Sequence, residues 1–321
     1  MLPVSFLIVT VIQIIAEMLP ISSSGHVRLF QLLSGAPVLL PKYFDEFLHV
    51  FSLLVLAIFF RHTWVPLLRR LWKIITLRSP STTLKSSNAL ESFETPFRLL
   101  RTSAEWRSKP LVLRKRRSRC LEGFERYSQQ RFLHLTLKLI TLITIVTLCT
   151  AAGYYGSKFI GAQLPWLSSP TALALGFAVT ALLLITSNRT LIRQPSFPLL
   201  IICMALAQSL AALLPGVSRF AITYTAARWL GRTPRRALQL SWLLITPLIT
   251  VAVAVNGLGD FMLGPDAGMV LQPAFWIASA AATAASYAAL CGVAQLAQRN
   301  KLWWIGVYML VPISTLVILK W

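Results

Sequence analysis

Six strongly apolar stretches limit what this chain can fold into, because each has roughly 17–25 residues, enough to cross a bilayer as a helix. Hydrophobic residues make up 56% of the 321-residue chain and charged residues only 13%. A soluble domain needs more polar surface than this composition provides. The chain is therefore predicted to be an all-α polytopic membrane protein. The six expected transmembrane helices are 45–61, 133–153, 171–187, 237–257, 272–296 and 302–320.

Two further apolar segments, 2–19 and 198–214, each run into a proline and a loop that contains Ser and Gly. Such segments are typical of re-entrant helical hairpins, whose exposed backbone is tolerated at membrane depth only inside protein or water. Shifting the chain by 195 residues aligns Gln13 with Gln208 and Pro20 with Pro215, and both copies read Gln-x2-Ala-x2-Leu-Pro-x2-Ser. This match predicts an inverted-topology repeat whose two loops meet near the bilayer midplane.

The distribution of positive charge predicts the topology. The formal net charge is +21, and residues 61–131 alone contain 17 Lys/Arg against 5 Glu. Because Lys and Arg gather in cytoplasmic loops, this segment is placed in the cytoplasm, the first hairpin enters from outside and the second from the cytoplasm. A basic segment of this kind serves topology or lies on anionic lipid, so no nucleic-acid partner is expected.

Four segments follow from this topology. The predicted organisation is a first re-entrant hairpin and span (1–60), a basic cytoplasmic insertion (61–131), two spans (132–197), and a second re-entrant hairpin with three spans (198–321).

Glu17 is the acid that falls within a predicted membrane-depth segment, and Gln13 lies four residues before it on the same helical face. A carboxylate in low dielectric needs a partner to stay charged, so a cation or an arginine should lie close by. We expect Arg219 to be that arginine.

Polar residues on the two loops could together bind a phosphate. Their backbone N–H groups and hydroxyls would face an anion at the start of the following helix, and an arginine guanidinium suits bidentate phosphate contact. The alternatives are that the serines cap helices and that the arginine extends to the membrane surface. The candidate phosphate ligands are Ser22, Ser23, Ser24, Gly25, Gly216, Ser218 and Arg219.

Histidines supply candidates for proton transfer. His26 follows the three serines and could act as a general acid or position a nucleophile, although a lone helical histidine is usually structural. His49 and Asp45 lie at the outer mouth of the first predicted span, where an interfacial role and a catalytic role are equally compatible with the sequence.

These motifs resemble those of the undecaprenyl-diphosphatase family. The family carries Glu-x3-Glu-x2-Leu-Pro-[Val/Ile]-Ser-Ser-[Ser/Thr]-Gly-His and a later Pro-Gly-x-Ser-Arg-Ser-Gly. Here the first reads Gln13-x3-Glu17-Met-Leu-Pro-Ile-Ser-Ser-Ser-Gly-His26, and the second reads Pro215-Gly-Val-Ser-Arg-Phe-Ala221. Further similarity runs from Phe44 through Phe60 and from Leu230 through Pro247, so it spans most of the chain outside 61–131.

The resemblance implies a multi-pass enzyme of the bacterial inner membrane that removes the terminal phosphate of undecaprenyl diphosphate. That reaction recycles the carrier lipid for peptidoglycan synthesis and confers bacitracin resistance. The site would be accessible from the outer side, and a homodimer is left open. Glu17, Ser23, His26 and Arg219 match the family's catalytic positions.

The departures from the family pattern bear on the cofactor. Gln13 replaces the family's first glutamate, and Phe220-Ala221 replaces Ser-Gly. Hard cations prefer charged oxygen ligands, so this change weakens the divalent-cation site, Mg²⁺ or Ca²⁺, that the resemblance implies at Glu17 and Gln13. Two alternatives stay open, a polyprenyl-phosphate flippase and a catalytically degenerate homologue, because an inverted repeat also suits transport.

Overall fold

A computed structural model of the protein describes residues 4–34, 43–61, 136–154, 164–193, 195–261 and 270–318, together with residues 40, 65, 69, 72, 156 and 268. The chain divides into two compact units, one formed by Met1–Phe59 with Leu142–Trp321 and the other by Phe60–Thr141. The predicted basic insertion, 61–131, lies almost entirely outside the described residues. The account below concerns the first unit.

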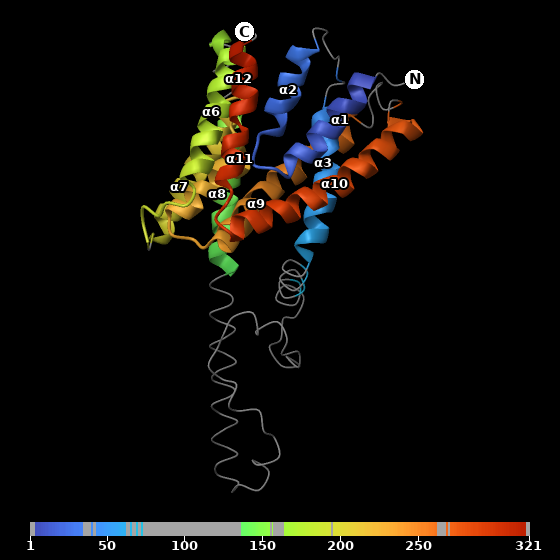
Figure 1. Ribbon diagram of the computed structural model, residues 1–321. Coiled ribbons are helices and arrows are strands. Elements are labelled where there is room, and N and C mark those ends of the chain that lie inside the picture. The colour runs from blue at the N-terminus through green and yellow to red at the C-terminus, as the bar shows by residue number, and fades with distance from the viewer. Residues whose placement is uncertain are drawn as a thin grey trace, which may run out of the picture. The chain divides into compact units, whose positions relative to one another are not determined.

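Every regular element in the described ranges is helical (Figure 1). One further helix, Thr136–Tyr154, carries no label in the figure. The labelled elements are α1 (Val4–Glu17), α2 (Ser23–Leu33), α3 (Phe44–Phe59), η3 (Pro165–Ser168), α6 (Pro170–Thr186), α7 (Phe197–Leu213), α8 (Arg219–Trp229), α9 (Pro234–Ala252), η4 (Val253–Phe261), α10 (Pro273–Gln298), α11 (Trp303–Tyr308) and α12 (Leu310–Ile318).

Three helices in the described ranges are long and apolar enough to cross a membrane, namely Thr136–Tyr154, Pro234–Leu258 and Pro273–Gln298. Four shorter apolar helices accompany them, Val4–Glu17, Pro170–Thr186, Phe197–Leu213 and Trp303–Ile318. The all-helical, multi-pass membrane character predicted from the sequence is thus confirmed. The count of six spans and two re-entrant hairpins stays a prediction.

Helix α7 shows how an almost wholly apolar sequence separates an inner face from an outer one. Leu206 and Leu210 are 58% and 47% exposed and lie one turn apart. Met204 and Gln208, by contrast, are fully buried. A helix whose exposed face is aliphatic and whose polar residue points inward suits a lipid environment outside and protein inside.

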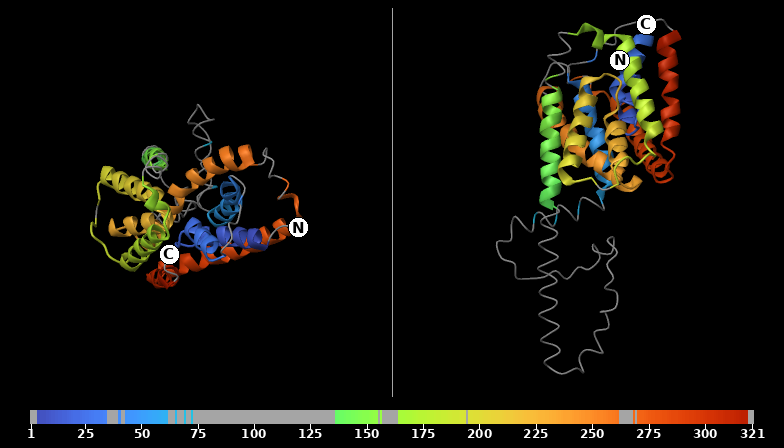
Figure 2. Two further views of the ribbon diagram at one scale, coloured as in Figure 1. Left: turned by 90° about the horizontal axis from the view of Figure 1, so that it is seen from above. Right: turned by 90° about the vertical axis from the view of Figure 1, so that its left-hand side faces the viewer.

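The first hairpin consists of α1, the tip 18–22 and α2. Helix α1 ends in a tightened turn, in which Met18 N–H donates to the Ile15 carbonyl at 3.2 Å and Leu19 N–H to the Ala16 carbonyl at 3.1 Å. The last carbonyls of a helix need other partners. Ser286 of α10 donates its hydroxyl to the Ile14 carbonyl at 2.5 Å, and α1 lies along α10 (Figure 2, left).

The second hairpin consists of α7, the tip 214–218 and α8. Gly216 adopts a φ of +84°, which a glycine accepts without steric penalty. Ser218 then caps α8 by accepting the Ala221 N–H at 3.2 Å. Figure 1 shows that α1 and α2 open toward the end of the unit that carries both termini, whereas α7 and α8 open toward the opposite end.

The start of α2, next to the first tip, and the second tip pack on the same stretch of α6. A Cβ on Gly25 would lie 2.7 Å from the Phe177 ring, and one on Gly216 would lie 2.7 Å from the Leu173 carbonyl oxygen. The Thr180 hydroxyl donates to the Gly216 carbonyl at 3.1 Å and accepts the Ser218 N–H at 3.0 Å. Helix α6 therefore holds the two tips side by side.

Replacing Gly216 by alanine should lower the stability of the folded protein by about 1–3 kcal/mol, the cost of a strained backbone position. The added Cβ meets both a positive φ and a carbonyl oxygen on α6. The measurement is the midpoint of thermal unfolding in detergent. Gly292→Ala is the control, because nothing lies within 4 Å of a Cβ at that position of α10. Equal midpoints for the two variants would contradict the packing described above.

Candidate active site

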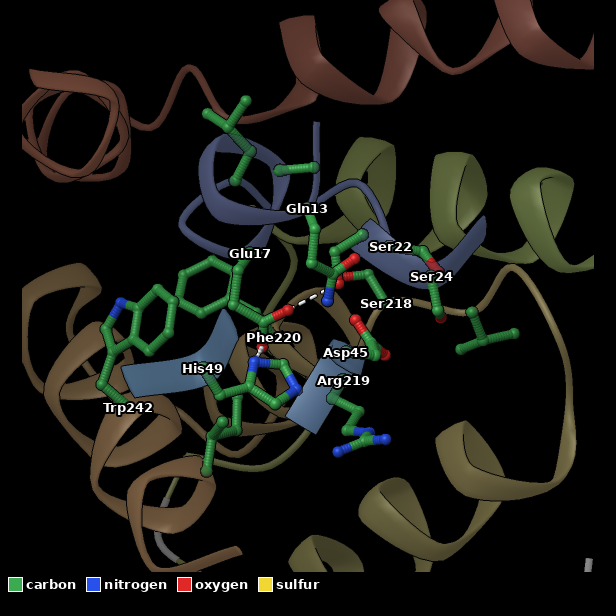
Figure 3. Close-up of a pocket in the computed structure, with 15 residues that line it drawn as sticks. Gln13, Glu17, Ser22, Ser24, Asp45, His49, Ser218, Arg219, Phe220 and Trp242 are labelled. Carbon is green, nitrogen blue, oxygen red and sulfur yellow. Dashed lines mark hydrogen bonds and ion pairs between the residues drawn. The ribbon is translucent and has the colours of Figure 1, made fainter. Parts of the chain in front are cut away.

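A polar cavity lies where the two tips meet α3 and α9 (Figure 3). Helix α1 and the first tip supply one side, the second tip and the start of α8 another, and α3 and α9 complete the wall. The lining residues are Gln13, Ala16, Glu17, Leu19, Ser22, Ser23, Ser24, Asp45, His49, Val217, Ser218, Arg219, Phe220, Trp242 and Ile245. Sequence positions about 200 residues apart thus share one cavity, as the repeat predicted.

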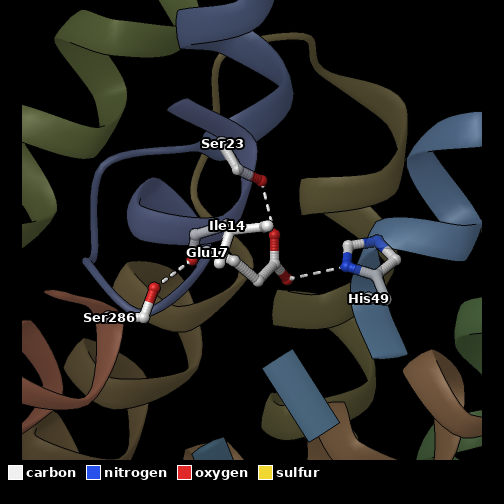
Figure 4. Close-up of polar contacts among 5 residues, drawn as sticks. All are labelled: Ile14, Glu17, Ser23, His49 and Ser286. Carbon is white, nitrogen blue, oxygen red and sulfur yellow. Dashed lines mark hydrogen bonds and ion pairs between the residues drawn. The ribbon is translucent and has the colours of Figure 1, made fainter. Parts of the chain in front are cut away.

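Glu17 lies at the centre of the polar contacts in this cavity (Figure 4). The Ser23 hydroxyl donates to its Oε2 at 2.5 Å, and His49 Nδ1 lies 3.9 Å from its Oε1. The side chains of Glu17 and His49 are only 14% and 12% exposed. A serine hydroxyl bound to a carboxylate in this way has a proton acceptor in place, which is the arrangement of an activated nucleophile.

Arg219 does not pair with Glu17, contrary to our expectation. Figure 3 shows its guanidinium on the Asp45 side of the cavity. Asp45 lies within electrostatic range of Arg219, Glu17 and His49. The partners of Glu17 are therefore Ser23 and His49, and the exposed guanidinium of Arg219 can contact a ligand.

Two helix N-termini meet at the cavity. Helix α2 begins at Ser23 and helix α8 at Arg219, so the first backbone N–H groups of both helices can donate to an anion. Ser22 precedes α2 with a φ of 66° and makes no side-chain capping hydrogen bond, whereas Ser218 does cap α8. The capping alternative therefore holds for Ser218 and fails for Ser22.

The predicted glycines act through packing. Gly25 lies against Phe177 and the Ser22 hydroxyl, and Gly216 lies against the backbone of α6. Neither lines the cavity. Their small size brings the two tips close to α6, and in this way they position the serines.

His26 does not line the cavity either. Its Nδ1 lies 2.9 Å from the Ser22 carbonyl oxygen, and its Nε2 lies 3.3 Å from the Tyr308 hydroxyl. The ring packs against Phe177 and stacks on Tyr308. A proton on Nδ1 satisfies the carbonyl and leaves Nε2 to accept from Tyr308. In this conformation His26 supports the tip through Ser22 and has no free nitrogen for a substrate.

Asp45 and His49 belong to the cavity, although the sequence left their role open. They lie four residues apart on α3, so they share one helical face. That spacing was the available signal. The rotation of α3 about its own axis, which turns this face toward α1 and the second tip, could not be predicted from the sequence.

Oxygen ligands for a hard cation lie on this cavity wall. Glu17 and Asp45 supply carboxylates, and Gln13 supplies an amide oxygen that is buried without a hydrogen-bond partner among the described residues. Mg²⁺ commonly binds one or two carboxylates together with substrate phosphates. Within the described ranges no group of three or more His, Cys, Asp or Glu is placed to hold a metal ion by itself. The residues present therefore fit an ion whose coordination a substrate phosphate would complete.

Comparisons with known proteins show which sequences this chain is similar to. The sequence profile of the family described as bacitracin resistance protein BacA matches residues 6–313. A protein of Saccharolobus islandicus named undecaprenyl-diphosphatase is 32% identical over 151 residues, which are 46% of this chain and 53% of that protein. The chain thus spans about half the length of this relative.

Two other relatives align over more of their length. The undecaprenyl-diphosphatase of Borrelia recurrentis is 28% identical over 243 residues, 74% of this chain and 70% of the relative. Undecaprenyl-diphosphatase 1 of Shouchella clausii is 25% identical over 313 residues, 95% of this chain and 91% of the relative.

Proposed function

Because the chain belongs to the family of the bacitracin resistance protein BacA, we propose that it hydrolyses undecaprenyl diphosphate to undecaprenyl phosphate and inorganic phosphate. The observation that carries the proposal is the hydrogen bond between Ser23 and Glu17 at the junction of two helix N-termini. A nucleophile with its proton acceptor, beside donors for an anion, suits phosphoryl transfer.

The proposed reaction uses three side chains. The Ser23 hydroxyl attacks the terminal phosphorus while Glu17 accepts its proton, and the bond from phosphorus to the bridging oxygen breaks. The lipid monophosphate leaves with that oxygen, and water then hydrolyses the phosphoserine to release inorganic phosphate. Arg219 and the N–H groups at the starts of α2 and α8 stabilise the charge on the transferring phosphoryl group.

A divalent cation, Mg²⁺ or Ca²⁺, belongs to the proposal. Glu17, Asp45 and the Gln13 amide oxygen would hold it, and it would neutralise charge on the phosphate oxygens. His49 Nδ1 lies 3.9 Å from Glu17 Oε1, so a protonated imidazole would form an ion pair with that carboxylate.

The proposed membrane arrangement has six spans and two re-entrant hairpins. The opposite directions of the α1–α2 and α7–α8 hairpins support it (Figure 1), as does the polar cavity between tips that apolar helices surround. On this topology the protein lies in the bacterial inner membrane with the cavity facing outward. Carrier-lipid recycling for peptidoglycan synthesis and resistance to bacitracin would follow.

The test is phosphate release from a C55 polyprenyl diphosphate by the purified full-length protein in detergent. We expect release with Mg²⁺ or Ca²⁺ and at least about a tenfold loss with a chelator, since an ion that stabilises transition-state charge contributes several kcal/mol. A polyprenyl monophosphate should release nothing. Absence of release under all metal conditions, together with transfer of polyprenyl phosphate between leaflets of a vesicle, would replace this proposal with the flippase alternative.

A further inference from the structure

A second cavity adjoins the first between α1, α2 and α3 and shares Gln13, Ser24 and Asp45 with it. The reaction proposed above assigns protein donors to the terminal phosphate only. A diphosphate ester carries a second phosphate next to the lipid, and the adjoining cavity lies where such a group could extend.

Gln13 is the residue that indicates a ligand in this second cavity. Its side chain is 2% exposed, and neither the amide nitrogen nor the amide oxygen has a hydrogen-bond partner among the described residues. Burying an amide without partners is unfavourable by roughly 1–3 kcal/mol in proteins. A side chain that bears this penalty on the wall of two cavities is suited to contact a bound polar group.

Helix α2 adds a polar stripe to the same cavity. Ser24, Arg28 and Gln31 lie at intervals of four and three residues, so they follow one another along one face of the helix. Arg28 is the cationic residue among those that line this cavity. The lining also includes the apolar residues Val9, Phe44 and Leu48, which suits a ligand with a charged end and a hydrocarbon chain.

We propose that this second cavity binds the lipid-side phosphate of the diphosphate, with Arg28 and the Gln13 amide nitrogen as donors. The inference rests on the proposed function and assigns the other half of its substrate. The diphosphate then lies between two arginines, Arg219 at the terminal phosphate and Arg28 at the phosphate that leaves with the lipid. Arg28 thereby makes the protein selective for diphosphates over monophosphates.

The experiment measures binding of methylenediphosphonate and of inorganic phosphate to the full-length protein in detergent by isothermal titration calorimetry. Wild type should bind the diphosphonate more tightly than phosphate. Arg28→Met, which keeps an apolar stem, should weaken diphosphonate binding by about tenfold, the typical effect of losing a charge-assisted hydrogen bond. Phosphate affinity should change by less than about twofold, well under the effect expected of a lost charged contact.

Controls separate this site from a general loss of charge or of folding. Arg235→Met removes an exposed arginine in the first turn of α9, outside both cavities, and should bind both probes as wild type does. Arg28→Lys keeps the charge without the guanidinium fork, so its diphosphonate affinity should fall between wild type and Arg28→Met. Equal weakening of both probes in Arg28→Met, or no weakening of either, would overturn the assignment.

Phosphate release distinguishes failure of this inference from failure of the proposed function. If the protein releases phosphate and Arg28→Met leaves the KM unchanged, the proposed site for the second phosphate is overturned and the proposed phosphatase function is retained. If wild type releases no phosphate but binds the diphosphonate in a way that depends on Arg28, the proposed phosphatase function is overturned and the proposed diphosphate site is retained.

Discussion

Replacing Arg219 by alanine is expected to lower the rate of phosphate release from a polyprenyl diphosphate by about a thousandfold or more, the range found for arginines that stabilise a transferring phosphoryl group. Arg219 is exposed, begins α8 and lines the cavity on the Asp45 side. The loss should fall mainly on kcat, because the charge that Arg219 neutralises grows in the transition state.

A charge-preserving variant sharpens this test. Arg219→Lys should recover part of the rate, since a lysine keeps the charge but not the paired donors of the guanidinium. Arg236→Ala, an exposed arginine of α9 outside the cavity, should turn over like wild type. If Arg219→Ala retained the wild-type rate, stabilisation of the transferring phosphoryl group would have to be assigned to other residues.

The second large effect is expected at Glu17. Glu17→Gln keeps the shape of the side chain and removes the acceptor for the Ser23 proton, so kcat should fall by about 10²–10⁴-fold, as for a lost general base. The kcat of Ser23→Ala should fall by at least the same factor. The measurement is steady-state phosphate release under the metal conditions that give the fastest wild-type rate.

The double variant tests whether the two residues act as a unit. If Glu17 works through Ser23, the combined variant should lose little more than Ser23→Ala alone. Glu46→Gln, an acid on α3 outside both cavities, serves as the control and should keep the wild-type rate. Independent, multiplying losses would mean that Glu17 contributes through the cation it is proposed to hold and not as the acceptor of the Ser23 proton.

The two tips could be predicted from the sequence because their signals are local. A proline ends each apolar helix, and serines follow within a few residues, so Ser22, Ser23 and Ser218 were identified directly. The topology argument from loop charges then placed both tips in one interior. Residues of both tips do line a single cavity, whereas the topology inferred from the loop charges stays a prediction.

The side-chain partners could not be predicted because they depend on how each helix is rotated in the packed structure. His26 was expected to transfer a proton or to position a nucleophile, and the structure places its ring against Phe177 and Tyr308, outside the lining of the cavity. Glu17 was expected to pair with Arg219, but in the structure the nearest ionisable partner that it contacts is His49 of α3, 3.9 Å away. Spacing along a helix tells which residues share a face, and packing decides where that face points.

Helix α6 sets the geometry of the cavity although none of its residues lines it. A few turns around Leu173, Phe177 and Thr180 contact one tip through Gly25 and the other through Gly216 and Ser218. The distance between the starts of α2 and α8 therefore depends on how each hairpin packs against α6. The donors that would meet a phosphate group can therefore move apart only if Gly25 leaves Phe177 or if the second tip loses both of its hydrogen bonds to Thr180.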